Sequence, residues 1–263
     1  MCLAVQRSTL AAALALALLG TSGGAATAAV VQRGALRVGV DAGISPRKLP
    51  RVGAAPVSVA IGLHVATTDS SLLPQLRHLR IEVNRAGRLE TAGLPTCRYR
   101  QIQPATSDQA LAACGPALVG RGHLTADVVL PYLAPLPSSG QVLAFNARYR
   151  GHRAILAHVF GTHPFPTSYT LAFAISRGRG RFGTALTAPL SRAVKDWGFL
   201  TSLSLKLGRT YRYRGATRSY LSAGCPAPAG FPTAAFPVAR ASLGFAGEPP
   251  LSSTVNGQCW VRR

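Results

Sequence analysis

Acidic side chains are few in this 263-residue sequence, which has 8 Asp and Glu residues against 29 Lys and Arg residues. The formal net charge of +21 predicts nonspecific attraction to polyanions whatever the fold. Salt bridging is the expected use of each carboxylate among so many cations. A glycosidase-type carboxylate pair would have to come from Glu82 with Glu90, or from Asp127 with Asp196.

Metal and cofactor motifs are also missing. No H-E-x-x-H sequence, phosphate-binding loop or C-x-x-C spacing occurs, so no zinc-protease or nucleotide-loop signature is present. His152 and His158 share one predicted strand, but six residues of strand separate them by about 20 Å, too far to hold one ion. The sequence therefore predicts no metal site and no cofactor.

Long hydrophobic runs are limited to the N-terminus. Arg7 precedes an apolar run from Leu10 to Leu19, and the segment Gly20 to Ala28 ends in an A-x-A cleavage pattern. This run is shorter than the roughly 20 residues that a membrane span needs. We therefore expect residues 1–28 to be a cleaved signal peptide. The mature chain is expected to have no transmembrane segment and to be secreted, either extracellular or associated with the cell wall.

Cleavage would remove Cys2 and leave an even set of four cysteines. Exported proteins meet an oxidising compartment, so two disulfides are expected. Pairing within each sequence-local pair closes the smaller loops and is therefore favoured over the two other pairings. The favoured bonds are Cys97–Cys114 and Cys225–Cys259.

Alternating side chains dominate the rest of the chain. From Val57 to Val65 every second residue is aliphatic, a period of two that suits a strand with one buried face. A turn at 84–87 is expected to return residues 88–91 as a hairpin partner of the strand at 79–83. The one predicted helix runs from Ser107 to Ala113, capped by Thr106 or Ser107. Further strands are predicted at 141–149, 153–160, 169–175, 182–187, 199–207, 217–223, 238–245 and 258–261.

Short strands with Gly- and Pro-rich breaks predict an all-β fold, an antiparallel β-sandwich or jelly roll with one short helix. We expect one domain over residues 29–263. The alternative is two β domains, 34–130 and 141–263, joined by the proline-rich segment 131–140.

The triplet Arg-Tyr-Arg recurs at residues 98, 148 and 212, and glycine follows it at the last two sites. On a strand this pattern places two guanidinium groups on one face and the tyrosine on the other. Arginine forks suit carboxylates, sulfates and phosphates. The alternative is a set of solvated arginines above a core-facing tyrosine. The run 177–181 is expected to be a hairpin loop. The candidate polyanion-binding residues are Arg148, Tyr149, Arg150, Arg153, Arg212, Tyr213 and Arg214.

The order of several segments resembles that of exported proteins of GC-rich actinobacteria. These segments are Gly93–Cys97, the helix leading to Cys114–Gly120, Leu143–Asn146, and Gly224–Pro226 ahead of a last strand with Cys259. The resemblance covers nearly all of the mature chain. It implies export and paired cysteines, and it implies no site.

These features predict a secreted, non-catalytic binding or structural protein of the cell envelope. Acidic glycans or other anionic wall polymers are the expected partners, and no specific nucleic acid is expected. The alternative is a carbohydrate-active enzyme such as a polysaccharide lyase on acidic glycans, because that chemistry can use Arg, His and Tyr side chains. Fold alone does not decide between them.

Overall fold

The computed structural model describes residues 27–190 and 198–262. The predicted signal peptide therefore lies almost wholly outside the described residues. Its last two positions, Thr27 and Ala28, begin the first strand and pair with Ala42 and Asp41.

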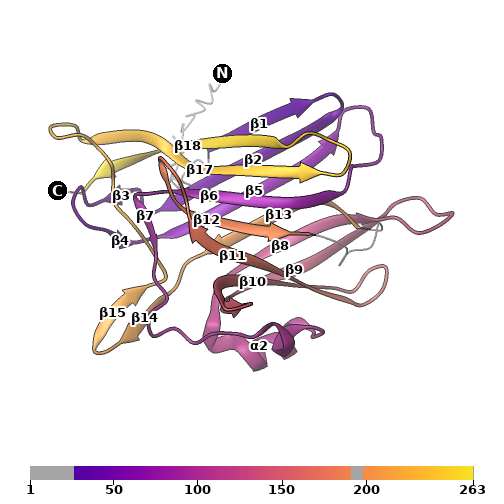
Figure 1. Ribbon diagram of the computed structural model, residues 1–263, viewed down its shortest axis with the longest axis horizontal. Helices are drawn as coiled ribbons and strands as arrows, with labels where there is room; N and C mark the ends of the chain where they lie inside the picture. Colours follow the sequence, from indigo (N-terminus) through magenta and orange to yellow (C-terminus); the bar gives the residue numbers. More distant parts are fainter. Residues whose placement is uncertain (1–26, 191–197, 263) are drawn as a thin grey trace, which may run out of the picture.

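One large sheet contains most of the chain (Figure 1). All neighbouring strands are antiparallel except the last pair, which is parallel. In their order across the sheet, its 13 strands are β1 (Thr27–Arg33), β2 (Leu36–Ser45), β5 (Ser58–Thr67), β13 (Gly198–Leu207), β8 (Leu118–Val128), β9 (Leu136–Tyr149), β10 (His152–Gly161), β11 (Thr167–Arg177), β12 (Phe182–Pro189), β6 (Leu76–Asn84), β17 (Thr233–Phe245), β18 (Leu251–Val261) and β3 (Lys48–Leu49).

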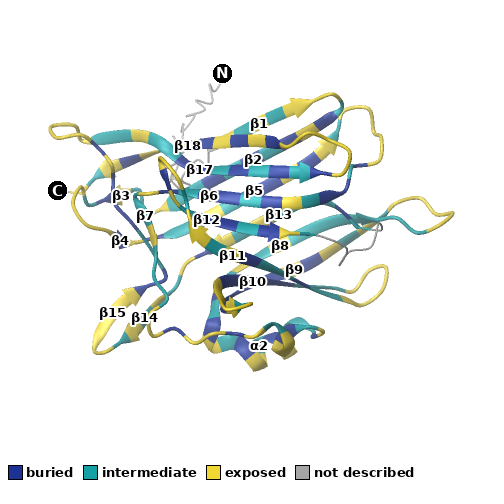
Figure 2. Ribbon diagram, in the orientation of Figure 1, coloured by how far each residue is buried: buried dark blue, intermediate teal, exposed yellow. Residues whose placement is uncertain are grey.

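The sheet curls until β1 lies against β18, so that the two ends of the strand order meet around a single apolar interior. Side chains alternate between this interior and the outside, as β2 illustrates: Leu36, Val38, Val40 and Ala42 are buried, and the residues between them are not. Figure 2 shows the same banding along the other strands. The prediction of an all-β, antiparallel, sandwich-like fold is confirmed.

A second, three-stranded sheet lies at one end of the interior. It consists of β4 (Ala55–Pro56), β16 (Leu221–Ala223) and β7 (Gly87–Leu89), with β16 in the centre. The expected hairpin between β6 and residues 88–91 is therefore wrong, because β7 leaves β6 and pairs with β16. Asn84 supports this departure, since its side chain accepts a hydrogen bond from the Ala86 N–H and donates one to the Pro237 carbonyl.

The predicted strand at 217–223 is two strands. Its first part, β15 (Ala216–Ser219), pairs with β14 (Thr210–Tyr213) in a separate hairpin, and its second part is β16. Tyr220 lies between them and is fully buried, and the backbone changes partners at this residue. Periodicity alone does not reveal such a change of partner.

The predicted helix is confirmed as α2 (Ser107–Cys114), capped by Thr106. The Thr106 hydroxyl accepts a hydrogen bond from the Gln109 backbone, and the Gln109 side chain accepts one from the Thr106 backbone. Neither α1 (Tyr99–Ile102) before α2 nor the 3-10 helix η1 (Gly115–Ala117) after it was predicted from the sequence. This helical segment covers the outer face of β9 and β10, where it buries Phe145 and Leu156.

Both predicted disulfides are confirmed. Cys97–Cys114 ties the helical segment into a loop, and Cys225–Cys259 ties the chain after β16 to β18. None of the helices in the described part of the chain is long and apolar enough to span a membrane.

The proline-rich segment leads from β8 into β9, and strands from both sides of it interleave in the main sheet. The strand β6 lies between β12 and β17, and β5 lies between β2 and β13.

The Cys97–Cys114 bond closes a loop with a sequence separation of 17. Replacing both cysteines with serine should lower the free energy of unfolding by about 3 kcal/mol, since the unfolded chain then gains conformational entropy. Denaturant unfolding of the double variant and the oxidised parent measures this difference. A difference near zero would mean that packing on β9 and β10 alone holds the segment.

Candidate functional site at the arginine-rich end of the sheet

Antiparallel strands return their turns alternately to opposite ends of a sheet, and arginines occupy the turns of one end. The β9–β10 and β11–β12 turns and the connection after β6 all lie there, because the strands β9, β10, β11, β12 and β6 are consecutive neighbours. We call this the basic end. Its arginines on these elements are Arg85, Arg148, Arg150, Arg153, Arg177, Arg179 and Arg181.

The two Arg-Tyr-Arg-Gly sequences form the same kind of hairpin tip. Arg150 and Gly151 have φ values of 49° and 81°, and Arg214 and Gly215 have φ values of 51° and 76°. Positive φ at both residues of a two-residue loop is the pattern of a type I′ turn. The expectation that both arginines of each triplet share a strand face is therefore wrong, because the second arginine lies in the turn.

The first triplet differs again, since Tyr99 and Arg100 belong to α1 and not to a strand. The run at 177–181 is confirmed as a hairpin loop, with Gly180 at a φ of 60°.

Arginine is an unusual residue at the first position of a type I′ turn. Asn, Asp and Gly are the usual residues there, because a larger side chain strains the left-handed conformation. Both Arg150 and Arg214 nevertheless adopt this left-handed conformation. Strained backbone conformations are common at functional sites, so their recurrence at these two exposed hairpin tips makes the two arginines candidates for a function.

Each turn arginine packs on its neighbouring tyrosine. The Cζ atom of Arg150 lies 5.3 Å from the Tyr149 ring centroid, and that of Arg214 lies 5.3 Å from the Tyr213 ring centroid. A guanidinium held over a ring keeps its N–H edges available to an anion. The two arginines are thus presented in the same way on two hairpins.

The two tyrosines have different neighbours on their other sides. The Tyr149 ring lies 5.7 Å from that of Tyr99. Tyr213 lies so close to Gly93 that a Cβ atom there would be 2.1 Å from the ring. The predicted arginines and tyrosines therefore lie on separate hairpins, each packed against its own segment.

The segment from residue 92 to residue 97 forms hydrogen bonds with both the β14–β15 and the β9–β10 hairpin. The Tyr211 hydroxyl of β14 donates a 2.8 Å hydrogen bond to the Ala92 carbonyl. A few residues later the Asn146 side chain of β9 donates to the Pro95 carbonyl, and the Cys97 N–H donates to the Asn146 carbonyl. The chain from 92 to 97 thus connects the β14–β15 hairpin to β9.

Like charges face one another at the basic end. Arg148 and Arg153 are direct cross-strand partners on β9 and β10, an arrangement that destabilises a sheet. Their guanidinium groups donate to carbonyl oxygens, of Gly151 and Leu89 respectively, each at 3.1 Å. None of the five predicted arginines lies within 4.0 Å of a carboxylate in the described residues.

The nearby carboxylates are already occupied. Glu82 is nearly buried and forms ion pairs with Arg80 and Arg240, and Glu90 accepts a hydrogen bond from the Ala92 N–H. The hairpin that would have paired Glu82 with Glu90 does not form. The other predicted pair involves Asp196, which lies outside the described residues. The described residues therefore show neither of the two predicted carboxylate pairs.

Burial by itself raises the pKa of Glu82, but hydrogen bonds from Arg240 and Arg80 outweigh it, so the pKa lies below its usual value of 4.5. A lowered pKa in the folded state means that the carboxylate stabilises the fold above pH 4.5 and loses this contribution as the pH falls through the folded-state value.

Replacing Glu82 with Gln should therefore cost about 2 kcal/mol of stability at neutral pH, where the charge-assisted hydrogen bonds are intact. The difference from the parent should shrink on acidification below pH 4.5. Denaturant unfolding of both proteins across this pH range measures it. A difference that does not change with pH would contradict the ion-pair assignment.

The histidines do not gather. His158 is fully buried on β10, with its Nδ1 atom 3.3 Å from the Thr170 hydroxyl. Burial lowers its pKa, and hydrogen bonds to backbone groups of Thr106 and Ile102 oppose this shift only in part. Within residues 27–190 and 198–262, no group of three or more His, Cys, Asp or Glu side chains is placed to hold a metal ion.

Comparisons with protein-family models, with curated proteins and with solved structures found no match. Function is therefore argued from the geometry. Sequence reasoning missed the contribution of Arg85 and of the arginines at 177–181 to the basic end. The Arg-Gly dipeptide gave no usable signal, because it occurs also at Arg33 in the β1–β2 turn of the opposite end and at Arg121 within β8, and Arg85 is followed by alanine.

Replacing Arg150 and Arg214 with Asn should raise the free energy of unfolding by about 0.5–1 kcal/mol at each site, since Asn tolerates positive φ better. The gain should be measurable by denaturant unfolding of the single and double variants. A loss of stability would show that packing on the tyrosines outweighs the backbone strain.

Proposed function

We propose that this protein is an exported, non-catalytic binding protein that holds anionic polymers, such as acidic glycans of the cell envelope, on its basic end. The observation that carries the proposal is the facing pair Arg148 and Arg153, neither of which lies within 4.0 Å of a described carboxylate. Repulsion between the two guanidinium groups lowers the stability of the fold, and a bound anionic ligand would offset this loss.

The turns would bind such a polymer by charge-assisted hydrogen bonds. Arg150 and Arg214 project from the hairpin tips, and their guanidinium forks match carboxylate and sulfate groups. Arg177, Arg179 and Arg181 add charge at the basic end, where the β9–β10 tip with Arg150 also lies. Several contacts of this type give affinity that falls steeply with salt.

Export is supported by the predicted signal peptide and by the two disulfides, which suit an oxidising compartment. The closed loops would also hold the fold together where chaperones and reductants are absent.

The lyase alternative has less support. A lyase would need its arginines and tyrosine in one cleft, whereas Tyr149 and Tyr213 lie on separate hairpins. Each of these tyrosines packs against its own segment, Tyr149 against Tyr99 and Tyr213 against Gly93.

The test compares two charge-matched double variants on immobilised heparin and on neutral glycans. Replacing Arg150 and Arg214 with Gln should lower the slope of log affinity against log salt by about 1.5–2, because two contacts are lost. The control replaces Arg33 and Arg37, which lie at the opposite end of the sheet beside the β1–β2 turn.

If both double variants lose the same affinity for heparin, the binding depends only on net charge. That result would contradict the proposed site. Cleavage of an acidic glycan by the parent, followed by the absorbance of an unsaturated product, would contradict the non-catalytic assignment and favour the lyase.

A further inference from the structure

The interior enclosed by the curled sheet is incompletely filled. A cavity of about 140 Å³ lies among strands β6, β8, β10, β11 and β13, and cavities of about 20 Å³ and 60 Å³ lie further along the interior. Native interiors contain few voids larger than a water molecule. A dry apolar cavity of about 150 Å³ is known to admit a molecule such as benzene.

Small inward-facing side chains create this space. Ala126 and Ala157 line the 140 Å³ cavity, the largest of these three, where neighbouring inward positions carry leucine or valine. Ala239 lines both of the smaller cavities. The walls of all three are mainly aliphatic, so an occupant has to be apolar where it touches them.

The cavities follow one another along the strands. Ile61 lines all three, and Leu79, Ile81 and Leu203 line both the largest and the smallest. Along β6 the lining runs from Leu76 in the largest cavity to Val83 and Asn84 in the 60 Å³ cavity. These residues span about 26 Å at the rise of a strand. A narrow chain fits this arrangement better than a compact ring does.

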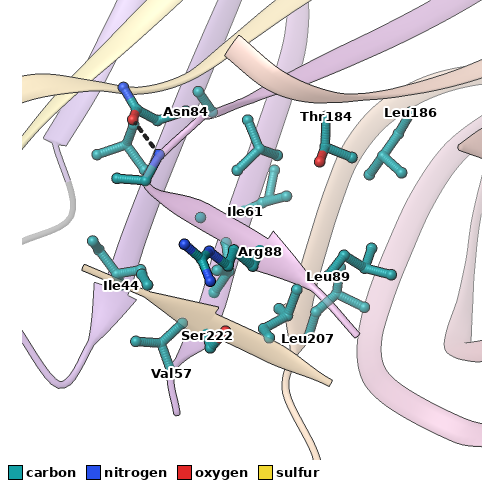
Figure 3. Close-up of a pocket in the computed structure, with 18 of the residues that line it drawn as sticks. Ile44, Val57, Ile61, Asn84, Arg88, Leu89, Thr184, Leu186, Leu207 and Ser222 are labelled. Carbon is teal, nitrogen blue, oxygen red and sulfur yellow. Dashed lines mark hydrogen bonds between the residues drawn. The ribbon is translucent and has the colours of Figure 1, made fainter. Parts of the chain in front are cut away.

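The 60 Å³ cavity reaches the surface at the basic end, beneath β7 and β16. Arg88 of β7 is exposed, and every other residue that lines this cavity is buried or half-buried. Figure 3 draws Arg88 among apolar neighbours that include Ile44, Val57 and Leu207.

The other polar side chains at this cavity are Asn84, Thr184 and Ser222. Asn84 is already held by its own hydrogen bonds. Arg88 forms no ion pair with a described carboxylate, so its guanidinium is available to a ligand.

We propose that the interior binds one unbranched aliphatic chain that ends in an anionic group, with the chain in the cavities and the anion on Arg88. Charge complementarity selects the end group, because the opening carries a cation and the basic end supplies several more. The aliphatic walls select the chain. This inference does not depend on polymer binding at the hairpin tips.

The first experiment titrates the purified protein with dodecanoate by calorimetry in buffered salt. Saturable binding of one molecule per chain, with a rise in melting temperature, is expected. Two cavity-filling variants, Ala239→Leu and Ala157→Leu, should weaken this binding at least ten-fold. The matched control is Ala66→Leu on the exposed face of β5, which should bind like the parent.

The second experiment tests the position of the end group. Arg88→Gln should weaken binding of dodecanoate about ten-fold and leave binding of dodecanol unchanged, whereas Arg37→Gln at the far end of the sheet should change neither. Equal loss for the acid and the alcohol would overturn the assignment of the anion to Arg88.

Absence of saturable dodecanoate binding to the parent would overturn the proposal. Undiminished binding by both cavity-filling variants would also overturn it, provided that circular dichroism shows them folded. If one of these variants fails to fold, the other carries the test. Heparin retention of Ala239→Leu should equal that of the parent, so failure of this inference is distinguishable from failure of the polymer-binding proposal.

Discussion

The structure depends on one constraint: a row of apolar side chains on every second residue has to be removed from water, and a single curled sheet does so by bringing β1 against β18. Burial of this face supplies the main driving force for folding. Curling places strands from distant parts of the sequence next to one another, such as β6 between β12 and β17. The positions of the turns, the outer helical segment and the small end sheet all follow from that enclosure.

Enclosure also separates the charge from the core. With so few acids in the chain, arginines cannot be neutralised pairwise, and the fold places many of them in turns that extend into solvent, where water and salt screen their repulsion. Glu82 is the exception, since it is buried between Arg80 on its own strand and Arg240 on the neighbouring strand β17. The strained arginines at the two hairpin tips and the facing pair on β9 and β10 each lower the stability of the fold.

The two disulfides stabilise a fold whose interior is not completely filled. One bond holds the helical segment against the outside of β9 and β10, and the other holds the chain near the small end sheet. These covalent links constrain the unfolded chain and do not require a completely filled interior. Alanines at inward positions such as Ala157 and Ala239 leave space that a larger residue would fill. The same fold therefore combines a charged outer end with an apolar inner space.

The sequence alone determined the strands, the helix and the disulfides, because these depend on local features of the chain. Alternation, the Thr106 cap and the close spacing of Cys97 with Cys114 act over a few residues, so strands, helix and disulfides were predictable. The missed pairing of β7 with β16, the change of partner at Tyr220 and the place of β6 beside β12 depend on partners more than 30 residues away. Only the tertiary structure could decide these, because strand order and cavity shape arise from contacts between segments whose separation in sequence carries no local signal.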